Sequence, residues 1–193
     1  MESQKQHEKI GGVAFLIGSI QFLVAITIAE MLNPGYDVLR RPVSDLGVGN
    51  FPIIFTMSII LYGIAGIIAS FFIYKLVRDS HFSLALVIAS FGTCFIGIFN
   101  ESFGPLHIFS SGISLTFGAI ATLIFSRHLS RPFSYYSVFT GLLSLAGLLL
   151  YVTGVYLGIG NGGMERIAIY PLIIWAGVVG SLMLAKSTAI KSI

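Results

Sequence analysis

The sequence has few charged residues. Asp, Glu, Lys and Arg make up 10% of its 193 residues, whereas hydrophobic residues make up 55%. A water-soluble domain carries about 25% charged residues, so this composition excludes an ordinary soluble protein. The length accommodates one compact unit but not a membrane domain plus a large soluble domain. We therefore expect a single membrane domain over residues 1–193.

Cysteine is almost absent, since Cys94 is the only one and lies within an apolar run. An internal disulfide and a thiolate metal site are thereby excluded. We predict no metal ion and no cofactor, because phosphate loops, haem motifs and dinucleotide fingerprints are missing as well. The formal charge of +3 comes from short loops and not from a basic patch, so nucleic acid is not an expected partner.

Long apolar runs are abundant, and each is long enough to cross a membrane as a helix. They predict an all-α bundle of six transmembrane helices with a long structured loop between the first two. Pro52 and Pro105 suit the first turn of a helix, and Asn161-Gly162-Gly163 is expected to separate the last two spans. Gly147, Gly154 and Gly158 are expected to pack the fifth span against a neighbour. The predicted spans are 10–32, 51–74, 82–99, 105–125, 136–159 and 167–185.

Lys and Arg are distributed unequally between alternate loops. The side of the N-terminus has eight of them and the other side has three, so the positive-inside rule predicts cytoplasmic termini in the cell membrane. The eight are Lys5, Lys9, Lys75, Arg78, Arg127, Arg131, Lys186 and Lys191, and the three are Arg40, Arg41 and Arg166.

The predicted outer side holds most of the remaining ionisable residues. Its first loop, residues 33–50, mixes charged with apolar residues and is long for a connection, which is typical of a functional loop. We expect it to fold back over the bundle. Asp45 in this loop has two interpretations: a turn or an ion pair with Arg40 or Arg41, or a carboxylate that faces a site.

His107 lies one turn inside the fourth span, and Ser111, Ser114 and Gly118 follow on the same helix face. Polar groups that face lipid are unfavourable, so this face should look into the bundle. His107 either binds a neighbouring helix or acts in a functional site. Ser111 is a candidate ligand contact beside it.

Three further residues precede predicted spans on the outer side: Glu101, Glu165 and Arg166. Both acids suit the positive end of a helix dipole, so capping is the simple interpretation. Arg166 has two interpretations, namely an internal ion pair or a bidentate contact to a phosphate or carboxylate ligand.

Three segments carry a resemblance to a known family: Ser44–Gly47 (SDLG), the junction from Glu101 to His107, and Met164–Trp175 (MERIAIYPLIIW). With these, the chain resembles the prokaryotic multi-pass membrane proteins catalogued as DUF998, a domain of unknown function. The resemblance implies a six-helix bundle over nearly the whole chain and carries no established activity.

The sequence leaves three functions open. The first is an outer pocket that binds or processes a lipid or polar headgroup. In that hypothesis His107, Asp45 and Glu101 are the candidate catalytic residues, and the candidate ligand contacts are Arg166, Glu165, Arg41 and Ser111. The second is a non-catalytic subunit of a membrane complex, in which these charges form structural ion pairs. A transporter is the least favoured, because the spans contain few acids. Membrane lipids, a membrane-protein partner or a second copy are the expected partners.

Overall fold

The computed structural model describes residues 2–185 and Ile190. Lys186 and Lys191, which entered the charge count, lie outside this part of the chain. The predicted all-α class is confirmed, since the described residues form six long helices and three short 3-10 helices. The long helices are α1 (Glu2–Met31), α2 (Pro52–Val77), α3 (Ser80–Ile98), α4 (Pro105–Phe125), α5 (Phe133–Val152) and α6 (Gly160–Leu184), and the short ones are η1 (Val43–Gly47), η2 (Glu101–Phe103) and η3 (Ser126–His128).

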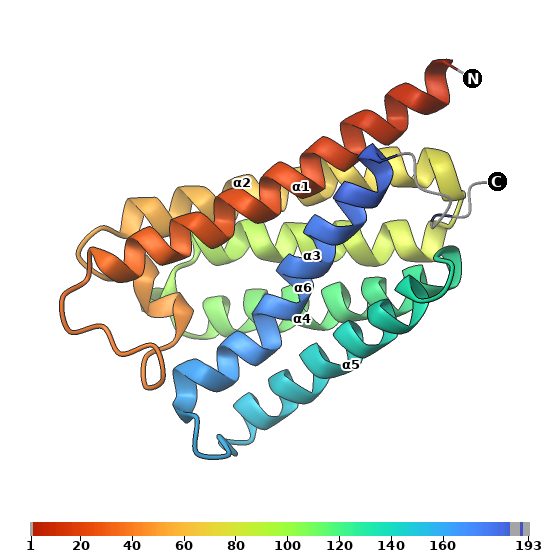
Figure 1. Cartoon of the computed structure of the whole chain (residues 1–193). Coiled ribbons are helices and arrows are strands. Elements are labelled where there is room, and N and C mark those ends of the chain that lie inside the picture. The colour runs from red at the N-terminus through yellow and green to blue at the C-terminus, as the bar shows by residue number, and fades with distance from the viewer. Residues whose placement is uncertain (1, 186–189, 191–193) are drawn as a thin grey trace.

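The six helices form a closed ring. Each packs against the next along the chain, and α6 returns to pack against α1 (Figure 1). We call the end of the bundle where α1 begins and α6 ends the terminal end, and the opposite end the distal end. The α1–α2, α3–α4 and α5–α6 connections lie at the distal end.

The helix starts follow from local chemistry. Pro52 and Pro105 begin α2 and α4, where a missing backbone N–H leaves no hydrogen bond unmade. Asp79 caps α3, because its carboxylate accepts hydrogen bonds from the backbone N–H groups of His81 and Phe82. In the described part of the chain, six helices are long and apolar enough to cross a membrane, and large apolar side chains such as Ile108 (70% exposed) point outward.

The boundary between the last two helices differs from the predicted one. Helix α5 ends at Val152, because Gly154 and Gly158 in the following loop adopt φ values of +74° and +82°. The expected packing of these two glycines within a span is therefore wrong. Gly147 does pack closely, since a Cβ there would lie 2.8 Å from the backbone nitrogen of Ala168 on α6.

Helix α6 begins at Gly160, earlier than predicted, so the Asn-Gly-Gly run belongs to its first turn. Its glycines allow the first loop to lie directly on the helix. A Cβ at Gly162 would collide with the carbonyl oxygen of Arg41, and Gly163 donates its backbone N–H to the carbonyl oxygen of Leu39 at 3.1 Å. Close approach of two backbones, and not a break between helices, explains these glycines.

The core has two apolar clusters, one in each half of the bundle. The cluster nearer the terminal end is built around Trp175, which makes edge-on contacts with Phe15 and Phe125. The distal cluster includes Val43 and Leu46 of η1, which are 1% and 0% exposed. The first loop therefore contributes side chains to the core of the bundle. This agrees with the prediction that it folds back over the helices.

Candidate functional site

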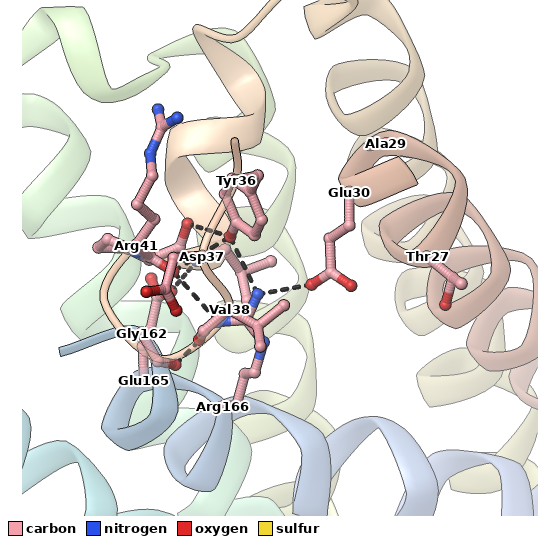
Figure 2. A network of polar contacts seen from close by, with 12 residues as sticks. Thr27, Ala29, Glu30, Tyr36, Asp37, Val38, Arg41, Gly162, Glu165 and Arg166 are labelled. Carbon is pink, nitrogen blue, oxygen red and sulfur yellow. Dashed lines mark hydrogen bonds and ion pairs between the residues drawn. The ribbon is translucent and has the colours of Figure 1, made fainter. Parts of the chain in front are cut away.

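Arg166, near the start of α6, is the centre of a hydrogen-bond network at the distal end (Figure 2). Its guanidinium forms an ion pair with Glu30 at the end of α1, with 2.5 Å between Nη2 and Oε1. The same nitrogen donates to the hydroxyl of Tyr36 at 2.9 Å. Nη1 donates to the backbone carbonyls of Val38 at 2.7 Å, Gly162 at 2.9 Å and Arg41 at 3.2 Å.

These contacts attach the first loop to α1 and α6. Burial raises the pKa of Tyr36 to about 12, so its hydroxyl keeps its proton and donates to the carbonyl of Pro42 at 2.6 Å. Of the two interpretations of Arg166, the internal ion pair is the one observed, and the partner is Glu30. The donors on Nη1 and Nη2 of the guanidinium are thus committed to the protein itself.

Glu165, the residue before Arg166, is only 8% exposed. Its carboxylate accepts hydrogen bonds from the backbone N–H of Val43 and from Ser44. Helix α6 begins five residues earlier, so Glu165 does not cap α6; it caps η1 instead, because Val43 is the first residue of that short helix.

Asp45 and Arg41 form an ion pair within the first loop, with 2.8 Å between Arg41 Nε and Asp45 Oδ2. Figure 2 shows the Arg41 side chain extending away from Arg166. Hydrogen bonding to Asp45 raises the pKa of the Arg41 guanidinium, so this cation stays charged. The ion-pair interpretation of Asp45 is thus observed, and Arg40 pairs with Asp37 instead.

Glu101, in η2, lies beside Asp45, and the two carboxyl groups share a hydrogen bond. Burial, this hydrogen bond and repulsion from Asp45 and Glu165 together raise the pKa of Glu101 to about 7. Near neutral pH this carboxyl is poised between its protonated and ionised forms. Two neighbouring carboxyl groups cannot both ionise freely, because their negative charges repel each other.

His107 is 8% exposed and bonds the end of α3, as one of its two interpretations predicted. Its Nδ1 lies 2.9 Å from the carbonyl oxygen of Phe99. A carbonyl only accepts, so Nδ1 carries a proton, and Nε2 is an acceptor in the neutral form of the ring. The hydroxyl of Ser111 lies 3.5 Å from Nε2 and donates to it.

A cavity of about 110 Å³ lies inside the ring, lined by α1, α2, α3, α4 and α6. Its walls are mostly apolar, and Ser44 and Glu165 line it where the first loop meets α6. The predicted inward face of α4 is confirmed, because Ser111, Ser114 and Gly118 all line this cavity.

The structure thus brings Asp45, Glu101, Glu165 and Arg41 together at the distal end. His107 and Ser111 lie on α4. Arg166 belongs to the hydrogen-bond network that attaches the first loop to α1 and α6, which we call the clamp. Sequence reasoning missed the clamp partners Glu30 and Tyr36, and it missed Ser90 and Thr93 of α3, which also line the cavity. An acid at the end of an apolar span was the available signal for Glu30.

Within residues 2–185 and Ile190, no three His, Cys, Asp or Glu side chains are arranged to hold a metal ion. The acids of the distal end are accompanied by a guanidinium and by backbone donors. Such a set suits polar recognition and proton exchange.

Six membrane-length helices around a partly polar interior define an integral membrane protein of the multi-pass class. The family described as "Protein of unknown function (DUF998)" matches residues 16–182. The chain belongs to this family, as the resemblance in its sequence indicated. The comparisons with curated proteins and with solved structures return no match.

Proposed function

We propose that the protein binds an amphiphile, with the polar headgroup at the distal end and the start of its apolar chain in the central cavity. The observation that carries this proposal is the composition of the cavity lining. Apolar side chains from five helices surround a space that ends at the carboxylate of Glu165 and at Ser44. An apolar pocket with a few convergent polar groups is the usual form of a ligand site.

The size of the cavity limits its occupant. A dry engineered cavity of about 150 Å³ binds benzene, so a space of about 110 Å³ accommodates a small group or a short stretch of chain. The rest of a larger lipid would lie outside the ring. The site therefore suits a headgroup and the first carbons of a single chain.

Native mass spectrometry of the gently solubilised protein tests this proposal. Leu115→Phe adds volume inside the cavity without changing charge, and Ile108→Phe is its control on the outward face of the same helix. We expect wild type and Ile108→Phe to retain a small molecule that Leu115→Phe loses. Equal retention by all three, or none by wild type, would contradict the proposal. A retained protein partner without a small ligand would favour the alternative of a complex subunit.

Processing of the bound molecule is a second candidate, favoured by the contact between His107 and Ser111. An acceptor nitrogen beside a hydroxyl that lines the cavity is the pairing of a general base with a nucleophile. A serine-directed fluorophosphonate tests it. We expect wild type to be labelled at Ser111 and His107→Gln to be labelled far more slowly. Labelling that is absent in wild type, or unchanged in the variant, would refute this candidate.

A further inference from the structure

The hydroxyl groups around the cavity share a feature that restricts the ligand: nearly all of them donate their protons elsewhere. Three of these hydroxyls donate to the carbonyl four residues earlier in their own helix, a common pattern for Ser and Thr in helices. The pairs are Ser90 to Leu86 at 2.7 Å, Thr93 to Ala89 at 2.9 Å and Thr122 to Gly118 at 2.9 Å.

The remaining serines of the lining are committed in the same way. Because Thr93 donates to its helix, Ser114 is the donor in their contact at 2.7 Å. Ser111 donates to the acceptor nitrogen of His107, and Ser44 donates to Glu165. What these six hydroxyls leave toward the cavity is their lone pairs.

The two other polar groups of the lining differ in what they offer. The indole N–H of Trp175 is directed away from the cavity, since it donates to Ser137 at 2.8 Å. The hydroxyl of Tyr62 retains both a proton and lone pairs, because no hydrogen bond to it occurs within the described residues. The cavity therefore presents many acceptors and a single free hydroxyl donor.

The charges at the distal end also favour a ligand that brings donors and a positive charge. Glu165 lines the cavity, and Asp45 and Glu101 lie beside it. The nearby cation of this group is Arg41, which pairs with Asp45, whereas Arg166 is engaged by Glu30. Three neighbouring carboxyl groups thus share one guanidinium, which pairs with Asp45, and a cationic ligand would offset the excess of negative charge.

We infer that the headgroup bound here is a protonated amine, which donates its N–H groups to Glu165 and to the lone pairs around it. This inference rests on the proposed amphiphile site and names its chemical class. An ammonium group supplies up to three donors and no acceptor, which complements the lining. A phosphate or carboxylate headgroup would meet acceptors of its own kind, and Arg166 is not free to bind it.

Three soluble probes with the same six-carbon chain test the class: hexylamine, hexan-1-ol and hexanoate. Trp175 is the only tryptophan of the chain and lines the cavity, so its fluorescence reports both occupancy and thermal unfolding. A ligand that binds the native state raises the unfolding temperature. We expect hexylamine to bind about tenfold more tightly than hexan-1-ol, which corresponds to about 1.4 kcal/mol of binding free energy. Hexanoate should bind most weakly of the three.

Glu165→Gln keeps the shape and one acceptor oxygen of the side chain, and we expect it to weaken hexylamine binding far more than hexan-1-ol binding, so that the preference for hexylamine disappears. Glu101→Gln tests the same charge effect from outside the cavity, should Glu165→Gln not fold. Asp37→Asn is the matched control, because Asp37 lies in the exposed part of the same loop, and it should leave the preference intact.

The outcomes separate the inference from the function on which it rests. Equal binding of the three probes, or stronger binding of hexanoate, overturns the amine inference but supports an amphiphile site. A preference that survives in both Gln variants also overturns it. No response of wild type to any of the probes overturns the amine inference together with the proposed function.

Discussion

The two ends of the bundle each hold a partly buried acid that joins segments far apart in the sequence, but the surroundings of the two acids shift their pKa values in opposite directions. At the terminal end, Asp79 caps α3 and bonds His128 of η3 at 2.7 Å, with Arg127 at 3.5 Å. At the distal end, Glu101 lies beside Asp45 and Glu165. One acid is surrounded by donors and cations, and the other by acids.

The pKa shifts follow from these surroundings. Burial disfavours the ionised form of Asp79, but hydrogen bonds from His128 and the backbone of Phe82, with the charge of Arg127, outweigh it and lower the pKa of Asp79. The pKa of Glu101 is raised to about 7. The terminal end is thus arranged for stability, whereas the distal end keeps uncompensated charge. Uncompensated charge in a partly buried place is characteristic of functional sites.

The largest effect on stability is expected when the clamp at the distal end is broken. This experiment shows which distal charges are structural. Arg166→Met leaves Glu30 unpaired and removes the guanidinium donor from three backbone carbonyls. Removing one partner of a fully buried ion pair destabilises by about 3–5 kcal/mol. Because the Arg166 and Glu30 side chains are 12% and 20% exposed, we expect a loss toward this size and a clear fall in the thermal unfolding temperature. Arg40→Gln, which removes an arginine with an 86% exposed side chain from the same loop, is the control and should change little. A mild effect of Arg166→Met would show that the loop does not depend on the clamp.

A medium effect is expected at the terminal end. Asp79→Ala removes the cap of α3 and the bond to His128, and loss of an N-cap alone destabilises by about 0.5–2 kcal/mol. Asp79→Asn keeps a capping oxygen and should lose less. Thermal unfolding of the two variants side by side measures the difference. If they were equally destabilised, the ionic contacts and not the cap would hold this end together.

The smallest effect is expected in the pH dependence of stability, which tests the raised pKa of Glu101. Its pKa is raised from 4.5 to about 7, so the folded state binds the proton more tightly than the unfolded state. Stability from this group therefore falls as pH rises from about 4.5 to about 7 and stays low above that window. Glu101→Gln should be stabilised relative to wild type at pH 8 and less so at pH 5.

Asp79 supplies the contrast for that measurement. Its lowered pKa gives a contribution that is present above its unfolded value of 3.8 and is lost as pH falls through the folded pKa. The part of the difference between Asp79→Asn and wild type that comes from the ionisation of Asp79 should accordingly be constant from pH 5 to pH 8. A Glu101→Gln difference that is equally constant over this range would remove the contrast between the two ends.

Much of the fold was predictable because hydrophobicity acts locally. Each span is recognisable from its own residues, and Pro52 and Pro105 begin helices for reasons contained in the first turn. The α5–α6 boundary was not predictable, because the glycines there serve different purposes. Gly154 and Gly158 adopt positive φ in a loop, whereas Gly162 lies in a helix against the backbone at Arg41.

The candidate site was predictable as a set of residues but not as a set of pairs. Counting charges on one side of the membrane identified Asp45, Glu101, Glu165, Arg166 and Arg41. Which cation meets which acid depends on how the first loop folds over α6. That contact joins residues more than 120 positions apart.

The sequence by itself determined that the chain is a six-helix membrane protein of the DUF998 family with a polar inward face on α4, because span length and helical periodicity are properties of single segments. Only the tertiary structure decided that Arg166 is committed to Glu30, that Glu165 caps η1 at the edge of the cavity, and that the cavity presents mainly acceptors. Those outcomes depend on which groups meet across the ring, and hydrogen bonds and ion pairs form only between groups in contact.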